Sequence, residues 1–158
     1  MLFRSFLSDE GHVDFPLYFE AVRPAHFSGD WRTIGFGLPM AIGLKIVCPS
    51  QHVVALCGDG AFSMSLQELT TMKAQESQPI IVVLNNSGYS GLRSRLIQFY
   101  GSSLGTDFAL PDLKALAPLF NLHGERVERA SELKPAFDRC LKANKGALVD
   151  VAIAESHP

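Results

Sequence analysis

Two short polar motifs follow two apolar runs of the sequence, and their side chains are of kinds that bind metal ions. The motif GDG, with Asp59 at its centre, comes directly after residues 53–57, and the pair Asn85 and Asn86 comes directly after residues 80–84. If the two runs are neighbouring strands of a parallel sheet, their carboxyl ends lie together and these side chains converge. A carboxylate, an amide oxygen and a nearby backbone carbonyl are hard oxygen ligands that suit Mg²⁺. A single carboxylate leaves part of the metal's charge for an anionic ligand.

The glycines of the first motif and the turn after the second are suited to hold phosphate. Gly58 and Gly60 allow a tight turn in which the amides of Gly60 and Ala61 point at phosphate oxygens. The turn SGYSG at residues 87–91 offers further amides and the start of a helix. Each motif alone is common in turns, but their joint occurrence at two matching strand ends is more specific. The sequence therefore predicts a site for Mg²⁺ and a diphosphate, without a lysine.

The elements that must position these residues follow from the alternation of apolar runs and helical patterns. Short aliphatic runs bounded by Gly, Pro, Asp or Asn predict buried strands at residues 2–7, 53–57, 80–84 and 147–153. Helical patterns are predicted at residues 36–47, 65–76, 91–99, 112–120 and 131–143. Strands that alternate with helices predict an α/β fold, a three-layer parallel sheet with helices on both faces. We expect one domain over residues 1–158.

Local signals add detail to the helices. Ser65 followed by Glu68 predicts a capping box, and Pro79 ends the helical pattern before the next strand. Pro118 and Pro135 lie inside helical patterns. We therefore expect these two helices to start later or to kink.

The composition excludes several classes of function. Sixteen acidic and fourteen basic residues are scattered without long runs, which argues against nucleic-acid and polybasic membrane binding. No apolar stretch approaches the roughly 20 residues of a membrane span, and the acidic residues soon after the first apolar run are unlike a signal peptide. The three cysteines are odd in number and widely spaced, which is typical of reduced thiols. We expect a cytoplasmic protein.

The spacing of the two motifs resembles the signature of thiamine-diphosphate-dependent enzymes, in which GDG is followed by Asn-Asn after 24 residues, as here. TIGFGLPMAIGL, SLQELTT and FYGSSLGTDFALPDLKALAPLF resemble segments of the acetolactate synthase and pyruvate oxidase group. The resemblance runs from about residue 28 to the end of the chain. It implies the diphosphate-binding and Mg²⁺-binding domain of that family.

The resemblance also implies a role for each site residue. Asp59 and Asn86 would bind Mg²⁺ through their side chains and Gly88 through its carbonyl. Ile34 matches the apolar residue on which the family bends its cofactor. The remaining residues would surround the diphosphate: Gly58, Asn85 and the amides of Gly60, Ala61, Tyr89 and Ser90.

Two features depart from the family pattern. Arg32 stands where the family has a glycine whose carbonyl receives the aminopyrimidine, so pyrimidine binding is less well supported than diphosphate binding. In the family, the glutamate that protonates the aminopyrimidine belongs to a separate pyrimidine-binding domain, and no glutamate of this sequence is assigned that role. We interpret Glu10 and His12 as part of a turn near the site. We expect Met64 and Leu66 to lie in the core or behind the site, and not to be catalytic.

The resemblance implies an enzyme that removes CO₂ from a 2-oxo acid such as pyruvate and passes the product to a second carbonyl, a proton or an oxidant. The pyrimidine-binding and middle domains of the family are absent from the sequence, so we expect either a fragment or one subunit of a split enzyme. Residues 91–101 (GLRSRLIQFYG) differ from the Trp-containing version in acetolactate synthases, which weakens any assignment of substrate.

Two alternatives and one interface complete the predictions. GFGLPMA at residues 35–41 offers a possible dinucleotide-binding fingerprint, but HFSGDWRT before it does not read as a strand. A noncatalytic regulatory or assembly subunit that keeps the cofactor half-site is the second alternative. The helix at 36–47 is apolar nearly all round, so we expect it to face a partner, in a homodimer or a hetero-oligomer with a pyrimidine-binding chain.

Overall fold

The fold is built on one parallel sheet. The computed structural model describes residues 5–8, 25–27 and 33–154. Six strands pair in the order β2-β1-β3-β4-β6-β5, all parallel. Their bounds are Ser5–Ser8 (β1), Ala25–Phe27 (β2), Val53–Gly58 (β3), Ile80–Asn85 (β4), His123–Val127 (β5) and Ala147–Ala152 (β6). The strand predictions for β3, β4 and β6 are confirmed; residues 2–4 of the first predicted strand lie outside the described residues.

The register of the central strands brings the two polar motifs together. β3 and β4 are neighbours, with Gly58 opposite Leu84. β4 also pairs with β6, where Asn85 lies opposite Ala152. The three strands therefore end at the same edge of the sheet, as expected for parallel strands of matched length.

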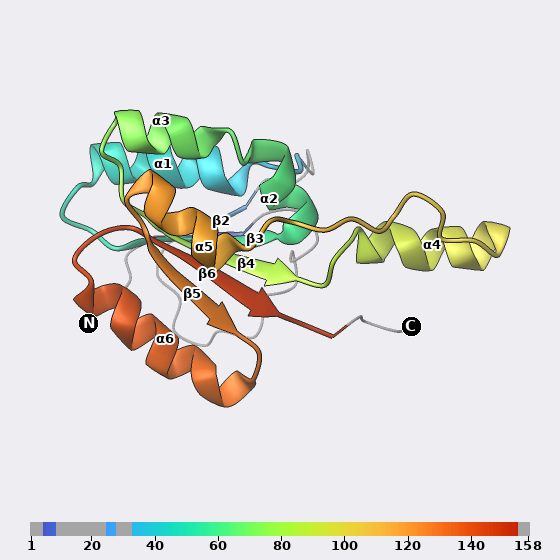
Figure 1. Cartoon of the computed structure of the whole chain (residues 1–158). Helices are drawn as coiled ribbons and strands as arrows, with labels where there is room; N and C mark the ends of the chain where they lie inside the picture. Colours follow the sequence, from blue (N-terminus) through green and yellow to red (C-terminus); the bar gives the residue numbers. More distant parts are fainter. Residues whose placement is uncertain (1–4, 9–24, 28–32, 155–158) are drawn as a thin grey trace.

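Helices cover both faces of the sheet, which confirms the predicted three-layer α/β fold. Their bounds are Gly37–Val47 (α1), Asp59–Ser65 (α2), Glu68–Ala74 (α3), Ser90–Tyr100 (α4), Leu113–Leu116 (α5) and Ala130–Lys142 (α6), with a 3₁₀ helix at Ala117–Phe120 (η3). Figure 1 shows α1, α3 and α5 on one side of the sheet and α6 on the other, whereas α4 extends away from the body. No helix of the described residues is long and apolar enough to cross a membrane.

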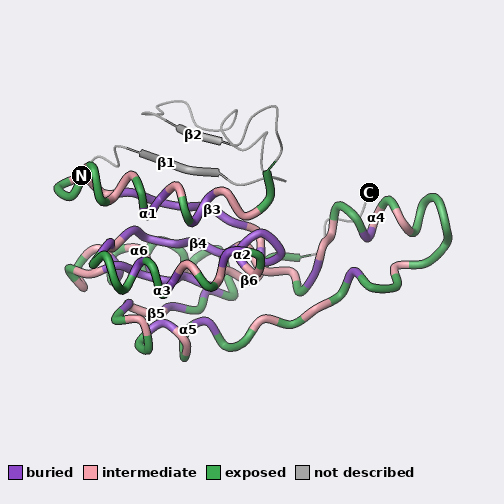
Figure 2. Tube along the Cα trace, turned by 90° about the horizontal axis from the view of Figure 1, so that it is seen from above, coloured by how far each residue is buried: buried purple, intermediate pink, exposed green. Residues whose placement is uncertain are grey.

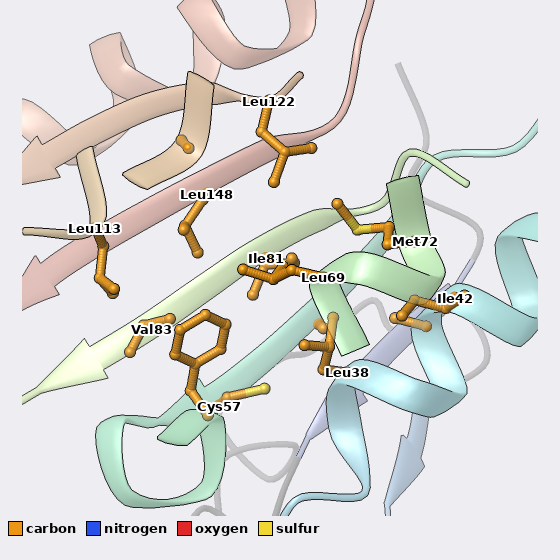
Figure 3. Packing of buried hydrophobic residues seen from close by; sticks show 14 of the residues in the cluster. Leu38, Ile42, Cys57, Leu69, Met72, Ile81, Val83, Leu113, Leu122 and Leu148 are labelled. Carbon is orange, nitrogen blue, oxygen red and sulfur yellow. The ribbon is translucent and has the colours of Figure 1, made fainter. Parts of the chain in front are cut away.

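The alternation of side chains along β3 supplies both cores. Val53, Ala55 and Cys57 belong to the cluster under α1, α3 and α5, and Val54 and Leu56 to the cluster on the α6 face. Figure 3 shows the first cluster, in which side chains from the helices meet those of the central strands. Because every buried strand residue faces a helix layer on one side or the other, β3 reads as a continuous apolar run.

The helix predicted at residues 65–76 is two helices. α2 starts at Asp59, directly after β3, and α3 starts at Glu68. Ser65 is the last residue of α2, and its buried hydroxyl donates to the carbonyl of Ala61 at 3.4 Å. The predicted capping box is therefore wrong, and α3 has no side-chain cap. The Gly and Ser residues of DGAFSMS (59–65) are typical of a turn, but this segment is a helix here.

Prolines and the two edge strands account for the other differences between the predicted and the observed elements. Pro118 lies in the first turn of η3, where its missing N–H is not needed, so the predicted helix 112–120 becomes α5 and a 3₁₀ turn. α6 contains Pro135 but starts at Ala130, so the expected later start is wrong there. The two edge strands, β2 and β5, were not predicted. His26 and Phe27 of β2 begin the segment HFSGDWRT, which was expected not to be a strand, so that expectation is wrong for these two residues. In β5, Glu125 and the polar residues beside it give no apolar run.

A buried carboxylate joins β5 to α6. Glu125 is 6% exposed, and its two oxygens accept hydrogen bonds from Arg139 at 2.6 and 2.9 Å. His123 lies 2.8 Å from the same carboxylate. The hydrogen bond from Arg139, opposed in part by burial, lowers the pKa of Glu125 to about 2. Burial raises the pKa of the nearby Cys140 thiol to about 11, so this cysteine is protonated at neutral pH.

We predict that Glu125→Gln destabilises the fold at pH 7 by about 1 to 3 kcal/mol, the usual range for losing a hydrogen bond to a buried charged group. The folded-state pKa of Glu125 lies below its ordinary value of 4.5, so its contribution is present above pH 4.5 and is lost as the pH falls toward 2. Urea unfolding of both proteins between pH 7 and pH 3 measures this. The difference in unfolding free energy should narrow on acidification; an unchanged difference would contradict the assignment.

Candidate functional site

The carboxylate of Asp59 joins the ends of two strands. Asp59 is 3% exposed and starts α2 directly after β3. Its Oδ1 accepts the Gly60 amide at 2.8 Å, and its Oδ2 accepts the amides of Asn86 at 3.1 Å and Gly88 at 3.0 Å. The predicted convergence of the two motifs is therefore confirmed. A carboxylate has about four acceptor positions, so three backbone donors leave one for a cation.

The two asparagines of the second motif point to different places. Asn86 lines a cavity at the carboxyl edge of the sheet. Asn85 is not among the residues that line this cavity, because its side chain reaches toward β6 and donates to Asp150 at 3.0 Å. Its Oδ1 accepts the amide of Ser87 at 3.1 Å. The contact of Asn85 with a diphosphate stays a prediction, and in this structure its side chain shapes the loop.

Two glycines of the site have no room for a side chain. A Cβ on Gly60 would lie 2.5 Å from the ring of Tyr89. A Cβ on Gly88 would lie 2.3 Å from a guanidinium nitrogen of Arg93 and 2.5 Å from the carbonyl of Thr106. The need for glycine here comes from the close approach of other groups, which leave no space for a Cβ atom.

Residues 106–108 brace the second motif from outside. Gly88 and Asp107 form an isolated antiparallel bridge, and the Tyr89 amide donates to Thr106 at 2.9 Å. The rings of Tyr89 and Phe108 pack with centroids 4.8 Å apart. This segment is included in the family resemblance of the sequence, but its contact with the second motif was not predicted. The brace holds the loop after β4 although α4 itself extends away.

The cavity has a volume of about 970 Å³, at the upper end of the usual range for a ligand site. Ile34, which is 46% exposed, contributes to an apolar wall, as the prediction of an apolar support for the cofactor requires. Met64 is 48% exposed and also lines the cavity, so the core is excluded as its place, whereas Leu66 packs against the core. The full lining is Ile34, Gly58, Asp59, Gly60, Ala61, Met64, Leu84, Asn86, Gly88, Tyr89, Ser90, Gly91, Leu92, Arg95, Ile153 and Ala154.

The charges that face this cavity are few. Among the described residues that line it, Asp59 is the one carboxylate and Arg95 on α4 is the one basic side chain. Sequence reasoning missed Arg95 and the apolar residues Leu92 and Ile153, because only the fold brings α4 and the end of β6 to the cavity. An anionic ligand bound here would be neutralised mainly by a metal at Asp59.

The donors available for phosphate differ from those predicted. The amide of Tyr89 donates to Thr106 and that of Ser90 to the Gly88 carbonyl at 3.1 Å, while Gly60 donates to Asp59. Ala61 lies in the first turn of α2, where the helix itself supplies no acceptor. Of the four predicted amides, Ala61 is therefore the best placed for an added anion.

The oxygen donors fit a small hard cation. The carboxylate of Asp59, the side chain of Asn86 and the carbonyl of Gly88 come from one short loop and one strand end, and all three residues line the cavity. The Gly88 carbonyl accepts one hydrogen bond and keeps a second lone pair. This set is compatible with Mg²⁺ completed by phosphate oxygens. Arg32, Glu10 and His12 lie outside the described residues.

Comparisons with known proteins agree with this geometry. Residues 12–151 match the family model described as the C-terminal TPP-binding domain of thiamine pyrophosphate enzymes. The chain is 35% identical over 139 residues to the acetolactate synthase isozyme 2 large subunit of Escherichia coli (strain K12), covering 84% of this chain and 25% of that protein.

Two further relatives show the same coverage. A probable acetolactate synthase large subunit of Methanococcus aeolicus is 32% identical, and the match covers 88% of this chain and 24% of that protein. The putative thiamine pyrophosphate-containing protein YdaP of Bacillus subtilis (strain 168) is 35% identical, and the match covers 80% of this chain and 22% of that protein. The chain thus spans about a quarter of the length of the curated relatives it matches. It belongs to the thiamine pyrophosphate enzyme family, and it comprises the C-terminal TPP-binding domain of that family.

Proposed function

We propose that this chain binds thiamine diphosphate and Mg²⁺ and forms the cofactor half of an acetolactate synthase-like enzyme acting on a 2-oxo acid such as pyruvate. The observation that supports this best is the buried Asp59 carboxylate, which is hydrogen-bonded to the amides of Asn86 and Gly88 at one edge of a 970 Å³ cavity. The three residues Asp59, Asn86 and Gly88 all line this cavity.

Each residue of the chain then has a physical task. Asp59, Asn86 and the Gly88 carbonyl would hold Mg²⁺, which in turn holds the diphosphate. Gly60 would lie beside the diphosphate at the cavity wall, and Ile34 would support the cofactor from the apolar wall. The bound cofactor would supply the electron sink for loss of CO₂, while the protein supplies orientation and electrostatics.

The described part of the site lacks one group that the proposed reaction needs. No glutamate is among the described residues that line the cavity, and we propose that a pyrimidine-binding domain of a second chain provides it. The exposed apolar side chains of the α4 region suit such a contact: Leu92 49%, Ile97 52%, Phe99 72%, Tyr100 78% and Leu104 90% exposed. Figure 2 shows α4 and the segment after it projecting from the body and mostly exposed.

Helix α1 contributes less to this surface than the sequence indicates. Leu38, Ala41 and Ile42 are buried in its own domain, and the exposed apolar residues Ile46 and Val47 lie at its carboxyl end. We therefore place the main partner surface on α4 and the cavity edge. None of the three cysteines, all of which are described, forms a disulfide, which supports the proposal of a cytoplasmic protein.

Two other functions are weaker. A dinucleotide-binding fingerprint needs a strand directly before its glycine-rich turn, but residues 33–36 before α1 are a turn and not a strand. A noncatalytic regulatory or assembly subunit would need the same hydrogen bonds to Asp59 for folding, so it is the open cavity beside Asp59 that favours a working cofactor site. The partner experiment described below separates a working site from a regulatory one.

We predict that Asp59→Ala abolishes Mg²⁺-dependent binding of thiamine diphosphate, because it removes the one carboxylate of the proposed metal site. Asp59→Asn, which keeps the shape of the side chain, should weaken binding more than tenfold. Titration calorimetry with Mg²⁺ and with EDTA measures both, and Asp138→Asn on the exposed side of α6 is the matched control. Equal affinity of Asp59→Asn and the parent would refute the metal site.

We also predict that Gly88→Ala disrupts the loop after β4. Its Cβ meets the backbone carbonyl of Thr106, which cannot turn away as a side chain can, so the loop must shift. Such overpacking typically costs about 1 to 3 kcal/mol. Gly43→Ala in α1 adds the same atom where nothing lies within 4 Å and is the control. Thermal unfolding and cofactor titration should show a loss only for Gly88→Ala; similar behaviour of the two variants would contradict this geometry.

The purified chain alone should not release CO₂ from pyruvate, whereas a mixture with its pyrimidine-binding chain should. Phe99→Asp should weaken that complex at least tenfold, because it places a charge on the exposed apolar side of α4, and Leu133→Asp on α6 is the control. Sedimentation measures the complex and a coupled CO₂ assay its activity. Steady activity of the isolated chain contradicts the need for a partner, and a complex without activity favours the regulatory alternative.

A further inference from the structure

A second buried carboxylate lies behind the site, on β6. Asp150 is 4% exposed, and its two oxygens serve different donors. Oδ1 accepts the Asn85 side-chain amide at 3.0 Å, and Oδ2 contacts the guanidinium of Arg126 on β5. Asp150 does not line the cavity and belongs to no motif of the sequence. It nevertheless links three neighbouring strands at their carboxyl ends.

The contact with Asp150 determines how the Asn85 amide is oriented. With Nδ2 facing a carboxylate, Oδ1 must face the other way, where it accepts the Ser87 amide at 3.1 Å. This is a turn closed by an asparagine side chain, and it holds Ser87 in a left-handed conformation with φ of 61°. The residues on either side of Ser87 are Asn86 and Gly88, whose amides both donate to Asp59.

The loop that carries Asn86 is therefore held from both sides. Asp59 holds its backbone from β3, and Asp150 holds its turn from β6 by way of Asn85. We propose that Asp150 is a positioning residue, which acts through Asn85 to present Asn86 and Gly88 to a divalent cation. This inference rests on the proposed function for the identity of the metal site, but the hydrogen-bond chain itself is formed by protein groups alone.

An exchange of the two side chains gives a sharp test. The two donors, Asn85 and Arg126, bind different oxygens of Asp150. In Asp150→Asn one of these oxygens becomes an NH₂ group, so one of the two donors loses its acceptor. In Asn85→Asp, two carboxylates face each other. In the double variant N85D/D150N, the new amide at position 150 can accept from Arg126 and donate to the new carboxylate at position 85, whose other oxygen accepts the Ser87 amide. All donors are matched again, with the total charge unchanged.

The experiment measures Mn²⁺ binding in the presence of thiamine diphosphate, by the loss of the free Mn²⁺ signal in electron paramagnetic resonance. Each single variant should bind Mn²⁺ at least tenfold more weakly than the parent, as is common when a partner of a metal ligand is removed. The double variant should return to within about threefold of the parent. Glu125→Gln, which also removes a buried carboxylate paired with an arginine, is the control and should keep parental affinity.

Amide exchange of Ser87, followed by NMR without metal or cofactor, is the second measurement. It should be faster in each single variant and restored in the double variant. Parental Mn²⁺ affinity in Asp150→Asn, or an equal loss in Glu125→Gln, would overturn the inference. If the parent chain binds no Mn²⁺ in the presence of thiamine diphosphate, the proposed function is contradicted instead. The exchange rate of the Ser87 amide then decides the positioning role of Asp150. Unchanged exchange in Asp150→Asn would overturn that role.

Discussion

The whole site depends on one carboxylate that accepts three backbone N–H groups. Asp59 takes one of them from its own turn and two from the loop after the neighbouring strand. Buried backbone amides must find acceptors, so this side chain is needed for folding of the edge even without a ligand. The same charge then attracts the cation. A single residue thus organises the loop and, in the proposed function, would also provide the one negative charge that faces the metal.

The position of Asp59 follows from the sheet. Parallel strands β3 and β4 end together because their apolar segments are equal in length and pair from Val54 with Ile80 to Gly58 with Leu84. The two motifs could therefore be placed beside each other from sequence alone, because the length and polarity of each strand follow from its own residues. The same rule predicted the α/β layers, because β3, β4 and β6 are runs of buried aliphatic residues with helical patterns between them.

What could not be predicted depends on partners far away in the chain. Asn85 resembles a site residue, but its amide is oriented by Asp150, 65 residues later. Gly88 is confined by Thr106, and nothing near Thr106 signals that contact. Strand β5 was missed because an edge strand needs little apolar sequence, and its buried Glu125 is satisfied by Arg139 from α6. In each case the deciding contact is with a residue far away in the sequence, so the local pattern does not indicate it.

The projecting helix α4 has a consequence for how such a site can vary. Residues 90–105 leave the body and return to almost the same point, where Gly88 and Asp107 bridge and Tyr89 meets Thr106. An excursion closed at its base can change in length or sequence without moving the strand ends that hold it. Because Leu92 and Arg95 reach the cavity from this excursion, the outer wall of the cavity can change separately from the strand ends that carry Asp59 and Asn86. Different substrate preferences could thus be installed by replacing this excursion alone.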